Sequence, residues 1–242
     1  MRKAGAGMQT TLKNGLTGNQ LKILALVFMT LDHIGAYLQP QILWLRIVGR
    51  LSMPIFAFMI AEGCRHTRSK VRYLAQMAAV AAVCQAAYWV VMGSVEQCIF
   101  VTFSLSLCLI FSVSWARERK RFLPWLCTAG VFLAVYYLCS VLPGRLPGTD
   151  FRIDYGIWGV LLPVFFYIGT SHWEKLLLGG IALVMLAQTA HSVQWWALAA
   201  LPLLALYSGQ RGKWRLKYLF YLYYPLHLAA LYGVKLLIEL WR

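Results

Sequence analysis

Apolar residues run through the chain in long stretches that polar residues interrupt at intervals. Nine stretches can be marked, at residues 21–38, 42–63, 71–92, 98–115, 122–142, 153–169, 175–190, 193–208 and 217–240. Most are long enough for a helix to cross a hydrocarbon core, and the shorter ones would cross as tilted or broken helices. Apolar and polar residues do not alternate as a membrane β-barrel requires. The pattern therefore predicts an all-α polytopic membrane protein with about nine transmembrane helices.

Composition indicates that lipid is the solvent for much of this chain. Of its 242 residues 60% are hydrophobic, which is more apolar surface than a soluble domain of this length could bury. We find no internal repeat, low-complexity tract or soluble domain, so residues 1–242 are expected to form a single transmembrane domain. Within it, residues 1–20 are expected to be a flexible cytoplasmic segment. The first stretch does not resemble a cleaved signal peptide, because it contains Asp32 and His33 and no small-residue cleavage site follows.

The net charge of +15 would suggest a nucleic-acid partner in a soluble protein, but its placement favours a membrane topology instead. Seventeen cations fall in alternate segments: Arg2, Lys3, Lys13, Lys22, Arg65, Arg68, Lys70, Arg72, Arg117, Arg119, Lys120, Arg121, Lys175, Arg211, Lys213, Arg215 and Lys217. The opposite segments hold only Arg145, Arg152 and Arg242, while Arg46, Arg50 and Lys235 lie in the membrane. Because cytoplasmic loops carry the excess of Lys and Arg, we predict a cytoplasmic N-terminus and an extracytoplasmic C-terminus. The basic inner face could also attract anionic lipid or a phosphorylated cofactor.

Ionisable residues inside the first stretch are the first candidates for a site. Ionisable groups at membrane depth are costly and usually mark function. Lys22 and His33 are eleven helical steps apart, which returns to within about 20° of the same face, roughly 16 Å further along. One stripe of the first helix thus connects a cation at the cytoplasmic mouth with an imidazole deep in the membrane. The alternative is a snorkelling lysine and a structurally hydrogen-bonded histidine.

The second stretch contains two arginines on one helical face, Arg46 and Arg50. Gly49 and Pro54 predict that this helix is kinked or interrupted. Arg50 should lie near mid-membrane, at a depth similar to that of His33. A structural ion pair between Arg50 and Asp32 is the alternative interpretation.

The last stretch adds a second histidine, His227, which should also lie near mid-membrane. Tyr223 is one turn below it, Pro225 should bend the helix between them, and Tyr224 flanks the same opening. Helices one, two and nine can therefore bring His33, Arg50 and His227 to one level, which predicts a functional site.

Four sequence blocks resemble the TraX family of membrane proteins. They are "LKILALVFMTLDHIG" (Leu21–Gly35), "GRLSMPIFAFMIAEG" (Gly49–Gly63), "DYGIWGVLLPVFFY" (Asp154–Tyr167) and "KYLFYLYYPLHL" (Lys217–Leu228). The resemblance implies N-acetylation of a conjugative pilin subunit with acetyl-coenzyme A as donor. It also implies a distant relation to membrane enzymes that O-acetylate bacterial glycans and to the lysosomal enzyme that acetylates heparan glucosamine. Many of those glycan acetylases carry a basic residue, ten intervening residues and an essential histidine, a pattern that Lys22 and His33 match. Arg50 matches an arginine that precedes their Pro-x-Phe block.

The resemblance implies roles for the ionisable residues of an acetyltransferase. His33 would be the base or the nucleophile, and Arg50 or His227 would stabilise the developing oxyanion. Asp32 is a further catalytic candidate, but it lies about 100° from His33 around the helix, so whether it orients the imidazole depends on the neighbouring helices. Residues expected to bind the donor are Lys22, Arg46, Arg50, Tyr223 and Tyr224. No metal is implied.

Several alternatives remain open at the level of sequence. O-acetylation of an exported glycan is the second enzymatic interpretation, and a transporter or an envelope-assembly protein are the non-enzymatic ones. The expected partners are acetyl-coenzyme A, an amine or hydroxyl acceptor (a pilin, a glycan or a small molecule) and membrane lipid, with homodimerisation left open. The expected location is the bacterial inner membrane, crossed several times.

Overall fold

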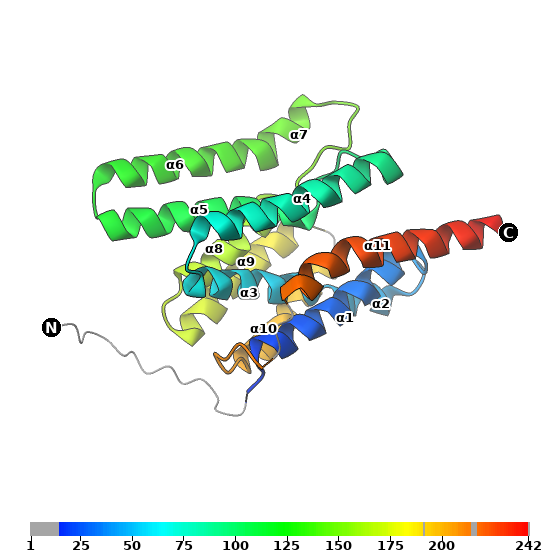
Figure 1. Ribbon diagram of the computed structural model, residues 1–242, viewed down its shortest axis with the longest axis horizontal. Coiled ribbons are helices and arrows are strands. Elements are labelled where there is room, and N and C mark those ends of the chain that lie inside the picture. Colours follow the sequence, from blue (N-terminus) through cyan, green and yellow to red (C-terminus); the bar gives the residue numbers. More distant parts are fainter. Residues whose placement is uncertain (1–14, 191, 214–216, 242) are drawn as a thin grey trace. The chain divides into compact units, whose positions relative to one another are not determined.

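The computed structural model describes residues 15–190, 192–213 and 217–241, and these residues are mainly helical (Figure 1). The elements are α1 (Gly18–Tyr37), α2 (Leu43–Gly49), α3 (Ser52–His66), α4 (Lys70–Met92), α5 (Ile99–Arg119), α6 (Phe122–Tyr136), η1 (Tyr137–Val141), α7 (Leu142–Arg145), α8 (Gly156–Ile168), α9 (His172–Thr189), η2 (Ser192–Ala199), α10 (Ala200–Ala205) and α11 (Lys217–Leu240). Extended pairing in the described residues is limited to two isolated β-bridges. Each predicted apolar stretch coincides with one helix or with consecutive helices, so the all-α class is confirmed.

Four helical segments are long and apolar enough to cross a membrane. They are Leu43–His66, Lys70–Val91, Ile99–Arg119 and Phe122–Arg145. The count of nine spans and the orientation of the termini stay predictions. Most of the segment predicted to be flexible, residues 1–14, lies outside the described residues.

The chain divides into two compact units. Unit 1 comprises Met1–Met59 and Ile168–Arg242, and unit 2 comprises Ile60–Tyr167. The expectation of a single domain stays a prediction. All the site residues predicted from the sequence belong to unit 1.

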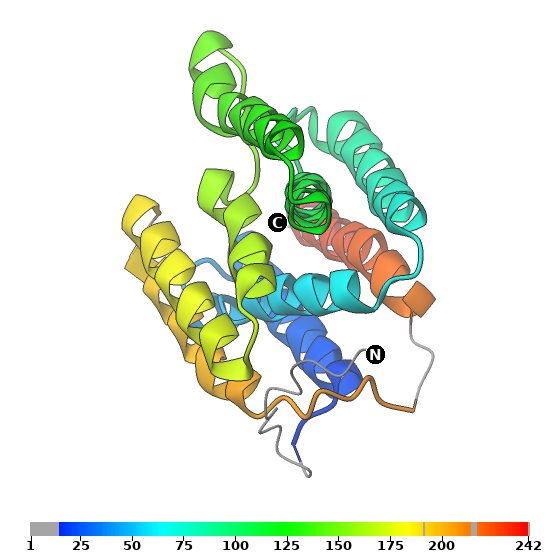
Figure 2. The same ribbon diagram turned by 90° about the vertical axis from the view of Figure 1, so that its left-hand side faces the viewer.

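In unit 1, α1 packs against α2 and α11, and α2 packs against η2. Figure 2 shows α9, in yellow, beside the orange η2–α10 segment. Two glycines let α1 and α2 approach closely. A Cβ at Gly49 would lie 2.3 Å from the Cβ of Asp32, and a Cβ at Gly35 would lie 2.9 Å from that of Leu45. Small residues at such contacts are typical of helix packing in membranes, and here they place Asp32 directly against α2.

The backbone N–H groups of the first turn of α1 are hydrogen-bonded to side-chain and backbone acceptors. Thr17 and Gln20 form a capping box. The N–H groups of Gly18 and Asn19 donate to the carbonyl oxygens of Gln210 and Arg211, at 2.7 and 2.9 Å. The Gln20 N–H donates to the Thr17 hydroxyl and the Thr17 N–H donates to Gln20 Oε1, so these contacts satisfy the four N–H groups that a helix start leaves without intrahelical partners. The loop after α10 is thereby fixed to the start of α1.

The predicted interruption of the second stretch is confirmed. α2 ends at Gly49 and α3 begins at Ser52, with Arg50 as the C-cap of α2. The backbone N–H of Arg50 still bonds to the carbonyls of Arg46 and Ile47, so helical hydrogen bonding continues up to the break. It places the Arg50 side chain at a helix end.

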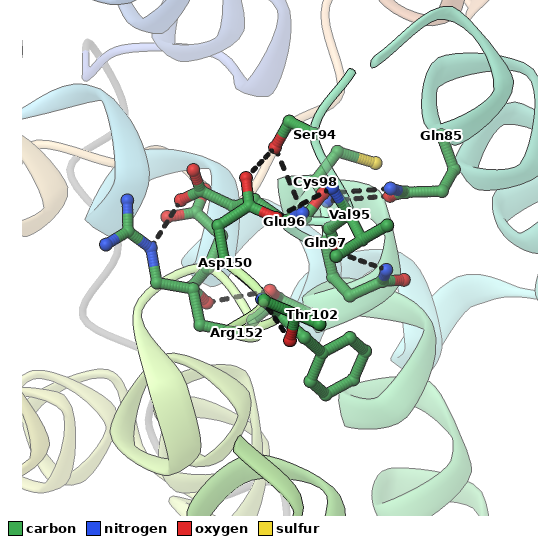
Figure 3. A network of polar contacts seen from close by, with 12 residues as sticks. Gln85, Ser94, Val95, Glu96, Gln97, Cys98, Thr102, Asp150 and Arg152 are labelled. Carbon is green, nitrogen blue, oxygen red and sulfur yellow. Dashed lines mark hydrogen bonds and ion pairs between the residues drawn. The ribbon is translucent and has the colours of Figure 1, made fainter. Parts of the chain in front are cut away.

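In unit 2, α5 packs against both α4 and α6, and a polar network joins two loops (Figure 3). The carboxylate of Asp150 accepts hydrogen bonds from the Ser94 hydroxyl at 2.6 Å and from the Val95 N–H at 3.0 Å. Arg152 forms an ion pair with Glu96 at 2.8 Å. The Ser94 hydroxyl, followed by the Val95 N–H, lowers the pKa of Asp150. The α4–α5 loop and the segment before α8 are therefore in direct contact within unit 2.

Candidate functional site in unit 1

Two histidines face each other between α1 and α11. His33 Nδ1 lies 2.8 Å from His227 Nε2, and the ring centroids are 4.9 Å apart. The other nitrogen of His227, Nδ1, lies 2.9 Å from the carbonyl oxygen of Tyr223, one turn earlier in α11. His227 is buried, with 8% of its surface exposed. The sequence predicted that His33, Arg50 and His227 converge at one level, and the structure places the two histidines in contact.

With both imidazoles neutral, these contacts favour one assignment of the ring protons. A carbonyl oxygen only accepts, so Nδ1 of His227 must be the donor to Tyr223. In a neutral imidazole Nε2 is then an acceptor, and it accepts from Nδ1–H of His33. In this assignment the remaining nitrogen of His33, Nε2, carries a lone pair. A chain of two hydrogen bonds thereby presents a basic and nucleophilic nitrogen.

Tyr223 fixes the plane of the His227 ring. The two rings stack with centroids 5.2 Å apart and an angle of 15° between them. The Tyr223 hydroxyl lies 2.7 Å from the Thr30 hydroxyl, which itself donates to the carbonyl of Leu26 at 2.9 Å. Tyr223 is therefore the donor to Thr30, and this bond connects α11 to α1 one turn before His33.

Two further tyrosines surround the histidine pair. Tyr37 stacks on His33 at 5.9 Å, and the buried ring of Tyr224 meets both imidazoles edge-on, at 6.2 and 5.5 Å. These contacts restrict rotation of both rings. Tyr223 and Tyr224, which were expected to bind the donor, thus lie directly against the predicted catalytic histidines.

Asp32 points to α2 and binds both of its arginines. Arg46 Nη1 donates to Asp32 Oδ2 at 2.9 Å, and Arg50 Nε donates to Oδ1 at 3.2 Å. Arg50 Nη2 also pairs with Oδ2. The Arg50 and Asp32 side chains are each 12% exposed and that of Arg46 is 32% exposed. The ion pair that the sequence left as an alternative is therefore present, and Arg50 contacts the residue next to His33 in the chain.

Gln194 on η2 belongs to the same cluster as Asp32, Arg46 and Arg50. The sequence analysis did not identify it as a site residue. Its Oε1 accepts from Arg50 Nη1 at 3.3 Å, and the residue is 4% exposed. Within the described part of the chain, its Nε2 is the one buried side-chain nitrogen or oxygen without a hydrogen-bond partner. The sequence does place this amide in the apolar stretch 193–208. Because buried polar groups are normally paired, that position could have identified Gln194 as a candidate site residue.

Lys22 lies at the opposite end of α1 from the histidines. It is partly buried, and the guanidinium of Arg211 is within electrostatic range of it. Two cations therefore lie near each other where α1 begins. Lys22 was predicted to lie at a cytoplasmic mouth. Arg211 is a second basic residue there, and it belongs to the loop whose carbonyl groups bond to the first turn of α1.

The helices and this buried cluster define an α-helical membrane protein with an ionisable site among the helices of unit 1. Comparison of the sequence with known protein families then identifies the family of this chain. The chain belongs to the TraX family, whose profile, described as TraX protein, matches residues 17–235. The family predicted from the sequence blocks is confirmed.

Two relatives are similar to the chain. A probable fimbrial assembly protein, FimC of serogroup H1 from Dichelobacter nodosus, is 26% identical over 259 residues, covering 91% of this chain and 96% of the relative. An uncharacterized protein, RP591 from Rickettsia prowazekii (strain Madrid E), is 55% identical over 38 residues, covering 16% and 15%. No solved structure matches the chain.

Proposed function

We propose that this protein is an integral-membrane acetyltransferase that moves an acetyl group from cytoplasmic acetyl-coenzyme A to an amino group of an acceptor at or across the membrane. The observation that carries the proposal is the hydrogen-bonded pair His33–His227. The bond from His227 to the Tyr223 carbonyl supports the assignment in which His33 Nε2 carries a lone pair and can act as a base or nucleophile.

The reaction needs one proton acceptor and one leaving group. The neutral amine attacks the thioester carbonyl, its N–C bond forms, and the C–S bond of the donor breaks. His33 Nε2 takes the amine proton and returns it to the coenzyme A thiolate, so that the products are the acetylamide and the free thiol. In the covalent variant of this scheme, Nε2 attacks the thioester carbonyl and the C–S bond breaks to release the coenzyme A thiolate. The amine then attacks the acetyl carbon, the C–Nε2 bond breaks, and the amine proton ends on the thiolate, so that the products are the same. Both variants require the same lone pair.

Donor recognition would use the cations at the start of α1. Lys22 and Arg211 supply positive charge that fits the phosphates of coenzyme A. We expect Lys22→Ala to raise KM for acetyl-coenzyme A more than it lowers kcat, because a ground-state contact is lost. Added salt should weaken donor binding in the same direction. Lys120→Ala, which removes an exposed cation at the end of α5, is the matched control and should leave KM unchanged.

The proposal for the acetyl acceptor rests on the name of one relative. The protein of Dichelobacter nodosus is named for fimbrial assembly, which supports a fimbrial or pilin subunit as the acceptor here. An exported glycan carrying a hydroxyl group is the second candidate. The location that fits either acceptor is the bacterial inner membrane.

The test uses the full chain in lipid bilayers with acetyl-coenzyme A labelled in the acetyl group. Pilin-containing and glycan-containing envelope fractions are added separately, and the labelled product is identified. The parent protein should label a pilin amine, whereas His33→Ala should bind the donor and lose about 10²–10⁴-fold in transfer, as for a missing general base. Folded His33→Ala protein that transfers acetyl groups at the parent rate would refute the proposal.

A further inference from the structure

The side chain of Gln194 contains the one unmatched polar atom in the described interior of unit 1. Its Oε1 is occupied by Arg50 Nη1, while Nε2 has no partner among the described residues. The amide orientation is determined by chemistry, because a guanidinium only donates and a flipped amide would oppose donor to donor. With 4% of the residue exposed, the N–H₂ group is removed from water. A buried donor in this position calls for an acceptor that lies outside the described residues.

The neighbours of Gln194 define what that acceptor can be. Nε2 shares a carbon with the oxygen that contacts Arg50, so it lies beside the guanidinium. Arg50 is held by the carboxylate of Asp32, the residue next to His33. Amide and guanidinium N–H groups are the donors that stabilise oxygen atoms bearing negative charge. A cation would be repelled by Arg50, and an apolar group would leave Nε2 unsatisfied.

We propose that Gln194 Nε2, together with Arg50, binds an oxygen atom that bears negative charge in the reacting complex. This inference rests on the acetyltransferase function proposed above. The oxygen can come from two sources: the acetyl carbonyl, as it becomes an oxyanion during transfer, or a carboxylate of the acceptor. The two sources give different kinetics, because an oxyanion exists only in the transition state whereas a carboxylate is already bound in the ground state.

Two substitutions separate the donor from the rest of the side chain. Gln194→Glu keeps the shape and the oxygen that accepts from Arg50 but replaces the N–H₂ donor by a second oxygen. Gln194→Met keeps much of the volume and removes both polar atoms. Gln41→Glu makes the same chemical change at an exposed position between α1 and α2 and serves as the control. Thermal melting identifies the variants that fold.

The variants are assayed with labelled acetyl-coenzyme A and purified pilin. If the oxygen is the acetyl carbonyl, kcat should fall about 10²–10³-fold in Gln194→Glu and Gln194→Met with KM for both substrates unchanged. If it is an acceptor carboxylate, KM for pilin should rise with kcat preserved. Folded Gln194→Met with parent kcat and KM would overturn the proposal, whichever result Gln194→Glu gives.

A second measurement keeps this inference distinct from the acetyltransferase proposal. A parent protein that never transfers acetyl groups would refute the function. In that case sodium acetate is the probe, with sodium chloride at equal ionic strength as the control. Acetate should raise the Tm of the parent and not that of Gln194→Met, and an equal response of both proteins would overturn the site.

Discussion

Exchanging His227 for asparagine and for glutamine tests the two hydrogen bonds that join the Tyr223 carbonyl, His227 and His33. Glutamine extends its amide to the position of an imidazole Nε2, so its oxygen can accept the proton of His33 Nδ1. Asparagine ends near the position of Nδ1 and leaves His33 without that acceptor. Both substitutions remove the stacking of Tyr223 on the His227 ring. Asparagine can keep the bond to the Tyr223 carbonyl and loses the 2.8 Å bond to His33, whereas glutamine keeps the bond to His33 and loses the one to Tyr223.

The expected magnitude follows from the charge that His33 acquires. When Nε2 takes a proton, the ring becomes cationic, and its Nδ1–H forms a charged hydrogen bond worth about 1.5–3 kcal/mol. Since about 1.4 kcal/mol corresponds to a factor of ten in rate, His227→Asn should lower kcat by about 10- to 150-fold. His227→Gln should retain most of the activity. KM for acetyl-coenzyme A should not change, because the bond strengthens only in the transition state.

The assay measures release of the coenzyme A thiol in bilayers, alongside the Tm of each variant. A structural role for His227 would instead lower Tm and yield in both variants while leaving kcat per folded molecule at the parent value. The reasoning is refuted if folded His227→Asn has the parent kcat, or if asparagine and glutamine lower kcat equally.

Three further predictions concern packing, pH and topology. Gly49→Ala should destabilise the protein by on the order of 3 kcal/mol or more, since its Cβ would overlap Asp32 and break a buried ion pair; a Tm equal to that of the parent would contradict this. The lowered pKa of Asp150 means that its ionised form stabilises the fold above the ordinary value of 3.8 and that this stabilisation is lost as pH falls through the lower folded pKa. The Tm difference between parent and Asp150→Asn should therefore shrink on acidification, and a difference that grows would be inconsistent with the network of Figure 3. Cysteine probes in intact cells should label Gly148→Cys and miss Lys120→Cys, whereas labelling of both would overturn the predicted orientation.

The helices of this fold could be predicted because their signal is local. The length of each apolar stretch and the Gly49–Pro54 interruption are properties of consecutive residues, and the structure agrees with both. The histidine pair could be predicted from depth alone, since His33 and His227 lie at matched distances from the cationic ends of their stretches. Depth along a helix does not specify its rotation, however. Whether Arg50 faces a histidine or Asp32 depends on the side on which α1 and α2 meet.

Contacts between distant segments account for what the sequence did not reveal. The approach of α1 to α2 is permitted by Gly49 and Gly35, and no pattern within either helix specifies it. Gln194 looked like a single polar residue in an apolar stretch until η2 placed it against Arg50. The loop network of Asp150 and Arg152 joins segments more than fifty residues apart, which periodicity cannot detect.

The closed first turn of α1 has a consequence for how ligand preference can change over time. Many proteins hold phosphate groups on the backbone N–H groups of a helix start, where every sequence offers the same donors. Here those groups already bond to Gln210, Arg211 and Thr17, so an anion at this mouth must be recognised by side chains. Single substitutions at Lys22 or Arg211 can then alter the preferred ligand while the backbone of the turn stays as it is. Relatives with the same helices can thus diverge in the acyl donors they accept, one side chain at a time.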